Sequence, residues 1–192
     1  MISAHPSINP TPQLETHGSF RIDTLRTRVA FSVRHLTGRV HGAFTRVKGL
    51  VTYDARRPEN LAVRVTIQSA SVVTHNAARD ARLRSSGFLD VRAFPEISFV
   101  SSSARRCRRS LEVTGDLTIH GIARPVTLTV GKMRKAATGG APEGRGSGIS
   151  VVARAQVLRS EFGVGPNSEL ELGGLMIGDV IAIEMDVELV RE

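Results

Sequence analysis

Residues 111–130 read LEVTGDLTIHGIARPVTLTV, and this stretch decides the fold class. Apolar or small residues occupy every second position from Leu111 to Ile119, and the alternation resumes from Val126 to Val130. A period of two is typical of a β-strand with one buried face. The His120-Gly121 pair between the two runs favours a tight turn. The stretch therefore predicts two antiparallel strands joined by a short turn.

The same alternation recurs along the chain from residue 20 and predicts an all-β protein of eight antiparallel strands. Small residues such as Gly115 and Ala155 recur on the inward faces, which suits a closed β-barrel that can hold one ligand. A β-sandwich would have a similar periodicity. Residues 20–23 are a possible ninth piece at an edge. The predicted strands are residues 29–35, 47–53, 61–67, 97–101, 111–119, 126–130, 149–157 and 181–189.

Two segments interrupt the alternation. Residues 74–86 read THNAARDARLRSS and predict a short helix, with Thr74 as its N-cap and Asp80 placed to interact with Arg84 one turn later. Together with the residues up to about 90, this segment forms a predicted helical insertion. Residues 160–178 predict a glycine-rich loop.

Length predicts one domain, since a chain of 192 residues can bury a core without help. Residues 1–19 contain several prolines among small polar residues and predict a flexible lead-in, so the barrel domain is expected to span residues 20–192. The lead-in has neither the basic start nor the apolar run of a secretory signal, and we therefore expect a cytoplasmic protein. No apolar stretch is long enough to span a membrane.

Composition excludes several classes of protein. Cys107 is the single cysteine, so an internal disulfide is impossible. The net charge of +8 comes from 23 Arg and 3 Lys against 18 carboxylates, and it favours anionic partners without naming one. Seven Phe, one Tyr and no Trp are too few for a surface that stacks on RNA bases.

Motifs for enzymatic chemistry are missing from the sequence. It contains no dinucleotide-binding, phosphate-binding or serine-nucleophile motif, and no histidine–cysteine spacing typical of a zinc site. We therefore predict no cofactor, no metal site and no catalytic residue. His35 ends an apolar stripe and is either a hydrogen-bonded core histidine or a general base. The basic run Arg105–Arg109 predicts a solvated hairpin tip, and nucleic-acid binding is the more specific alternative hypothesis for this run.

Several motifs, in the expected order, resemble the YceI family across residues 20–190. The central one is Thr74-x4-Arg79-Asp80-x2-Leu83-x-Ser85-x2-Phe88-Leu89-Asp90-x3-Phe94-Pro95-x-Ile97-x-Phe99-x-Ser101. It is followed by Gly115-Asp116-Leu117-Thr118-Ile119-His120-Gly121-Ile122-x-Arg124-Pro125-Val126-x-Leu128. Shorter matches are Phe31-x-Val33-x-His35 near the start, and Arg159-x2-Phe162-Gly163 and Gly178-Asp179 near the end. Arg82 departs from the pattern, because the family often has His there.

The resemblance implies an extended lipocalin-like barrel of eight antiparallel strands with helical segments beside its opening. It also implies that the barrel binds an isoprenoid lipid or another long amphiphile without catalysing a reaction. Elementary energetics add a mechanism, since each CH₂ group removed from water contributes roughly 0.8 kcal/mol. A dry, shaped interior is then sufficient for binding.

The predicted ligand-binding residues fall into three groups. Leu83, Phe88, Phe162 and Met176 are expected to cover the mouth of the barrel. His35 and Arg79 are candidates for contact with a headgroup, although Arg79 could instead pair with a carboxylate such as Asp80. The inward positions expected to line the cavity are Phe31, Val33, Val51, Val65, Ile67, Phe99, Val113, Leu117, Val157 and Ile183.

These observations favour a carrier, storage or sequestering protein whose partner is a hydrophobic small molecule, such as an isoprenoid, polyprenyl, quinone-like or fatty amphiphile. No nucleic acid is expected under that interpretation. Two alternatives remain, namely a small-molecule enzyme that uses His35 and a module that binds nucleic acid or an anionic surface through Arg105–Arg109. Edge strands would allow a homodimer, but nothing in the sequence requires one.

Overall fold

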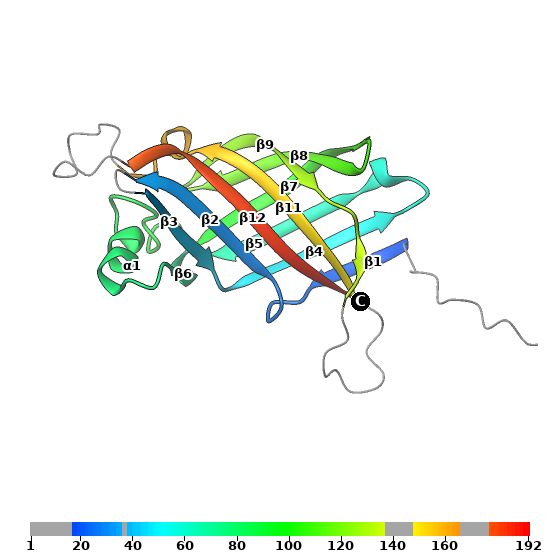
Figure 1. Ribbon diagram of the computed structural model, residues 1–192, viewed down its shortest axis with the longest axis horizontal. Helices are drawn as coiled ribbons and strands as arrows, with labels where there is room; N and C mark the ends of the chain where they lie inside the picture. The colour runs from blue at the N-terminus through cyan, green and yellow to red at the C-terminus, as the bar shows by residue number, and fades with distance from the viewer. Residues whose placement is uncertain (1–16, 36–37, 137–147, 166–176) are drawn as a thin grey trace, which may run out of the picture.

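Antiparallel strands make up most of the computed structural model, which describes residues 17–35, 38–136, 148–165 and 177–192 (Figure 1). The strands are β1 (His17–Ile22), β2 (Arg28–His35), β3 (Gly38–Phe44), β4 (Val47–Asp54), β5 (Ala62–Gln68), β6 (Val72–Val73), β7 (Glu96–Cys107), β8 (Ser110–Ile119), β9 (Ile122–Val130), β10 (Arg134–Lys135), β11 (Ile149–Leu158) and β12 (Ile177–Arg191). The helices are α1 (Ala77–Arg84) and the short 3₁₀ turns η1 (Pro58–Asn60), η2 (Ser69–Ser71) and η3 (Arg159–Phe162).

Eight of these strands close into a barrel. Their order is β11-β9-β8-β7-β5-β4-β1-β12, and β12 closes the ring by pairing with β11. Neighbours in this ring are antiparallel. The predicted closed eight-stranded antiparallel barrel with a short helical insertion is therefore confirmed, and the sandwich alternative is excluded.

The two ends of the barrel have different walls, because the long strand β12 has two partners on one of its edges. β1 pairs with the C-terminal part of β12, from Ile22↔Leu189 to Phe20↔Arg191. β2 pairs with the N-terminal part, and β3 and β6 continue the sheet outward from β2. In Figure 1, α1 lies at the end of the barrel beside β3 and β6, and β1 lies toward the other end.

Three details differ from the sequence-based prediction. β1 belongs to the ring rather than to an edge, and it begins at His17, ahead of the predicted boundary at residue 20, because His17–Arg21 pair with β4. β3 is not among the predicted strands because two of the four positions on its inward face, Gly38 and Gly42, are glycines, which leaves only Val40 and Phe44 as an apolar signal. The N-cap of α1 is Asn76 rather than Thr74, and the Asn76 side chain accepts a hydrogen bond from the Arg79 backbone N–H.

Side chains fill the barrel at the end that contains β1, which we call the filled end. Phe20, Ile149 and Leu189 each expose 2% of their surface there, and Val113 exposes none. These residues sit on alternating positions of β1, β8, β11 and β12, as the period of a barrel strand requires. Of the helices in the described ranges, none is both long and apolar enough to cross a membrane.

Candidate ligand-binding cavity

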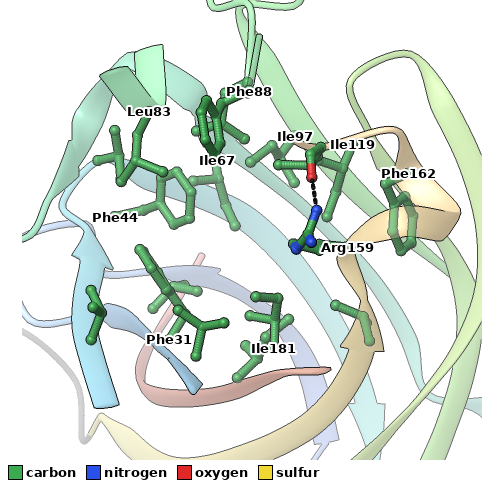
Figure 2. Close-up of a pocket in the computed structure, with 18 of the residues that line it drawn as sticks. Phe31, Phe44, Ile67, Leu83, Phe88, Ile97, Ile119, Arg159, Phe162 and Ile181 are labelled. Carbon is green, nitrogen blue, oxygen red and sulfur yellow. Dashed lines mark hydrogen bonds between the residues drawn. The ribbon is translucent and has the colours of Figure 1, made fainter. Parts of the chain in front are cut away.

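The other half of the barrel, which we call the hollow end, encloses a cavity of about 780 Å³. This volume lies in the range of sites that bind small molecules. Apolar side chains from the barrel strands, from α1 and from η3 face this common space, as Figure 2 shows for a subset. The lining residues are Val29, Phe31, Val33, His35, Gly38, Arg39, Val40, Phe44, Val65, Ile67, Val72, Ala78, Arg79, Arg82, Leu83, Phe88, Leu89, Ile97, Phe99, Leu117, Ile119, Val126, Leu128, Ala155, Val157, Arg159, Phe162, Val164, Ile177, Ile181, Ile183 and Met185.

One glycine shapes this wall. Gly42 lies opposite Phe31 in the β2–β3 ladder, and a Cβ atom at Gly42 would overlap the Phe31 ring. Glycine therefore allows the ring to occupy its position on the cavity wall. The Phe31 ring packs there against Phe44 with a centroid distance of 5.7 Å. The two rings form one side of the cavity in Figure 2, and Phe162 and Arg159 lie on the other.

A buried carboxylate organises the rim of the cavity next to α1. Asp80 Oδ1 accepts hydrogen bonds from the Thr74 backbone N–H at 2.8 Å and from the Thr74 hydroxyl at 2.6 Å. Chiefly the Thr74 hydroxyl, helped by the Thr74 backbone N–H and by Arg84 and Arg79, holds the pKa of Asp80 below its usual value of 3.8 despite the opposing effect of burial. Asp80 is therefore ionised at neutral pH and ties the start of the insertion to α1.

Arg79 is held in place by the same threonine. Its Nε donates to Thr74 Oγ1 at 2.8 Å, and its Nη2 donates to the Thr74 carbonyl at 3.0 Å. The side chain is half-buried and lines the cavity. The described residues contain no ion pair between Arg79 and a carboxylate, which is the expected alternative. The Arg79 guanidinium instead donates to the Thr74 hydroxyl, which in turn donates to Asp80.

Two other arginines of α1 have separate roles. Arg84 donates to the carbonyls of Ala70 and Val72 at 2.9 and 2.6 Å, which fastens the helix to η2 and β6. Arg82 is exposed, and its guanidinium carbon lies 5.6 Å from the centroid of the Phe88 ring. This distance permits a cation–π contact that places the charge at the rim.

Arg159 enters the cavity from η3. Its three guanidinium nitrogens donate to the carbonyls of Val164, Gly178 and Ile177, at 3.1, 3.3 and 3.4 Å. These bonds join η3 to the start of β12 and satisfy the polar groups of a side chain that faces apolar neighbours. Figure 2 shows one of these bonds as a dashed line at Arg159. Next to it, the Phe162 ring is fully buried.

The residues on which the alternative functions depend either lie away from the cavity or lack, among the described lining residues, the partners that catalysis needs. The run Arg105–Arg109 forms the β7–β8 hairpin at the filled end, where Arg105 pairs with Glu112. Within the described part of the chain, no three His, Cys, Asp or Glu residues are grouped to hold a metal ion. His35 lines the cavity, but none of the lining residues named above is a Ser, Thr, Cys, Asp or Glu that could be activated by it or orient it.

Comparison with known proteins places the chain in a family. The model of the YceI-like domain matches residues 20–189, which is nearly the whole described chain. The chain belongs to the YceI family. Protein YceI of Salmonella newport is 41% identical over 101 residues, and that of Escherichia coli O157:H7 is 40% identical over 101 residues. The alignment spans about half of each chain, 52% of this one and 53% of the relative.

Solved structures of several bacterial proteins have the same fold. BcnA of Burkholderia cenocepacia superposes with a TM-score of 0.74 at 22% identity, over 89% of this chain and 99% of that one. A polyisoprenoid-binding domain from Saccharophagus degradans gives 0.67 at 14% identity, over 92% and 99%. The Campylobacter jejuni YCEI protein gives 0.63 at 23% identity, over 80% and 85%. At these identities the likeness shows the fold alone.

The YceI barrel brings most of the predicted site residues together at the cavity. The exceptions are Val51 and Val113, which point inward but lie in the solid core of the filled end, so they do not line the cavity. Met176 lies outside the described residues. Those at the cavity are Phe31, Val33, His35, Val65, Ile67, Arg79, Leu83, Phe88, Phe99, Leu117, Val157, Phe162 and Ile183. Their role in binding a ligand stays a prediction.

Several lining residues are not predicted by the sequence pattern. Arg159 stands out in the sequence only as part of a family motif, and its reach into the cavity depends on the turn of η3, which periodicity does not reveal. The lining residues Arg39, Val40 and Phe44 are not predicted because β3, the strand that carries them, is not predicted. A signal exists for Phe44, since Gly42-x-Phe44 follows the Phe31-x-Val33-x-His35 motif closely in the sequence.

Proposed function

We propose that this protein binds one long apolar molecule in the cavity of the hollow end and acts as a non-catalytic carrier or storage protein. The observation that carries the proposal is the cavity of about 780 Å³ with an almost wholly apolar lining. The Saccharophagus degradans protein of the same fold, a polyisoprenoid-binding domain, agrees with it.

Hydrophobic transfer supplies enough free energy for such binding. Each CH₂ group moved from water to the cavity contributes about 0.8 kcal/mol. A tail of about ten such groups would gain about 8 kcal/mol, against which the costs of immobilisation are set. The half-exposed side chains of Phe31, Ile181 and Ile183 face the cavity, so a ligand tail would cover apolar surface that the protein itself leaves uncovered.

A non-catalytic role is supported by the chemistry of the lining. The polar side chains among the lining residues of the described chain are His35 and four arginines, Arg39, Arg79, Arg82 and Arg159. Arginine stays protonated and is a poor general base. These residues suit recognition and positioning of a ligand rather than turnover.

The test combines extraction with a cavity-filling variant. We expect organic extracts of the purified full chain, analysed by mass spectrometry, to contain a long-chain apolar compound. We also expect Ala155→Leu to weaken binding of dodecanol to the delipidated protein about tenfold, because the added carbon atoms occupy space that the tail needs. Calorimetry measures this affinity.

Gln156→Leu is the matched control, since Gln156 is the next residue of β11 and is exposed on the outer face. It should bind dodecanol like the wild type. Extracts free of lipid, together with no binding of dodecanol by the delipidated wild type, would contradict the proposed function.

A further inference from the structure

The charged side chains at the cavity all have the same sign. Four arginines, Arg39, Arg79, Arg82 and Arg159, line it, and the described lining residues include no aspartate or glutamate. The rest of the cavity wall is apolar apart from His35. A positive rim next to an apolar space is complementary to an amphiphile that has a negative headgroup and an apolar tail.

The rim differs in this respect from the outside of the barrel. On the outer strands, basic side chains pair with carboxylates, as in Arg105–Glu112, Arg154–Glu184 and Lys48–Glu96. None of the ion pairs found in residues 17–35, 38–136, 148–165 and 177–192 includes Arg39, Arg79 or Arg82. Arg39 and Arg82 therefore have no carboxylate partner in the described chain, and Arg79 is influenced by Asp80 through the Thr74 hydroxyl that both residues bind.

Arg79 is the best prepared of the three. Thr74 binds its Nε and Nη2, and Asp80 fixes Thr74 in turn, so the guanidinium is held before any ligand arrives. The same residue contributes to the cavity lining, and its Nη1 has no hydrogen bond to the described chain. A pre-oriented guanidinium loses little conformational freedom when it binds a carboxylate or a phosphate.

Arg82 extends the positive rim along α1, the helix that also carries Arg79. Arg82 is on the next turn of α1 and rests over the Phe88 ring. Arg39, at the start of β3, also contributes to the lining, but its Nη1 lies 3.5 Å from the hydroxyl oxygen of Ser32, on the opposite face of β2 from Phe31 and Val33. Arg82 is exposed, so it can reach a headgroup that stays in contact with water while the tail is buried.

We propose that the ligand is an anionic amphiphile, with a carboxylate or phosphate headgroup held at the rim by Arg79 and Arg82 and with its apolar tail in the cavity. This inference rests on the proposed function and adds the charge of the headgroup. A neutral headgroup would leave the charge of Arg82 without a counter-charge in the described chain, and an ammonium headgroup would be repelled by the Arg79 and Arg82 guanidinium groups.

The test compares probes that share one tail and differ in the headgroup. Dodecanoate, dodecyl phosphate, dodecanol and dodecyltrimethylammonium are titrated into the delipidated full chain below their micelle concentrations. We expect the two anions to bind at least roughly tenfold more tightly than dodecanol, and the ammonium compound to bind most weakly. Inorganic phosphate, titrated alone, shows whether the headgroup is recognised without a tail, and we expect it to bind far more weakly than dodecyl phosphate.

Two variants assign the preference to the rim. Arg79→Gln and Arg82→Gln should each lower the ratio of dodecanoate to dodecanol affinity by about tenfold. Arg82 is exposed and its guanidinium donates no hydrogen bond to the described chain, so its variant tests the rim even if Arg79→Gln perturbs folding. Arg106→Gln is the matched control, because it removes the same charge from the β7–β8 hairpin at the filled end. It should keep the wild-type ratio.

The other outcomes separate the two proposals. Equal affinity for all four probes would overturn the anionic headgroup and leave the apolar cavity in place. If Arg106→Gln reduced the preference for anions as much as Arg82→Gln does, the preference would come from the overall positive charge of the protein. That result would overturn the role of the rim. A failure of all four probes to bind would overturn the proposed function, and the headgroup with it.

Discussion

The filled end and the hollow end of the barrel are built from the same alternating strands but have opposite interiors. Along β11, Ile149 and Val151 pack into the core, and further on Ala155 and Val157 line the cavity. Along β12 the order is reversed, with Ile181 and Ile183 at the cavity and Leu189 in the core. An inward-facing apolar residue therefore only packs in the core in one half, whereas in the other half it also lines the candidate binding site.

The difference arises from what surrounds each end. At the filled end, β1 and β4 close the wall beside β12, and the rings of Phe20 and Tyr53 fill the space within it. At the hollow end, the β2–β3 hairpin takes the place of β1, and α1 and η3 lie over the space instead of filling it. The stability of the fold should therefore depend mainly on the filled end, and ligand binding on the hollow end.

The largest predicted effect is on stability and distinguishes the two ends directly. Ile149→Ala should lower the free energy of unfolding by about 2–5 kcal/mol, because it leaves a hole in close-packed core. Ile183→Ala should cost only about 1 kcal/mol, since one side of Ile183 already faces the cavity. Urea denaturation of the two variants measures both values. Equal losses would mean that the hollow end is as tightly packed as the filled end.

A smaller effect is expected from the carboxylate that supports the rim. Asp80→Asn should lower the free energy of unfolding by about 1–2 kcal/mol at pH 7, because it weakens the hydrogen bonds from Thr74. Asp116→Asn, at an exposed position of β8, should change stability little and is the control.

The effect of Asp80→Asn should depend on pH in one direction. The pKa of Asp80 is lower in the folded protein than its usual value of 3.8, so ionised Asp80 stabilises the fold above that pH. The contribution is lost as the pH falls below 3.8 and through the folded pKa. The difference between wild type and variant should thus be constant near neutral pH and shrink in acid. A difference that grew on acidification would contradict this role of Asp80.

Much of the architecture is predictable from the sequence, because alternation reports which side chains point inward. The strands around Val33, Val65, Leu117 and Ile183 are identified in this way, and the closed barrel is confirmed. Alternation has no information on whether the inward space is filled, which is why it assigns Val113 and Leu117, on the same face of β8, to a shared site that contains only Leu117.

The remaining differences have local causes. The alternation of β3 is weak because Gly42 must be small beneath the Phe31 ring, and that requirement is visible only once the two strands are paired. Thr74 resembles an N-cap, but its hydroxyl donates to Asp80 and accepts from Arg79, which leaves the cap to Asn76. Propensity rules describe a helix in isolation, whereas this one is fixed by its contacts with the barrel.

The central claim is that an apolar molecule binds in the hollow end and nowhere else in the barrel. Methyl NMR of the isoleucines during titration with dodecanol tests it most directly, because isoleucines line both halves. We predict saturable shifts for Ile67, Ile97, Ile119, Ile181 and Ile183, which face the cavity, and unchanged resonances for Ile22 and Ile149 in the filled end. Unchanged resonances throughout, or shifts of equal size at both ends, would contradict the claim.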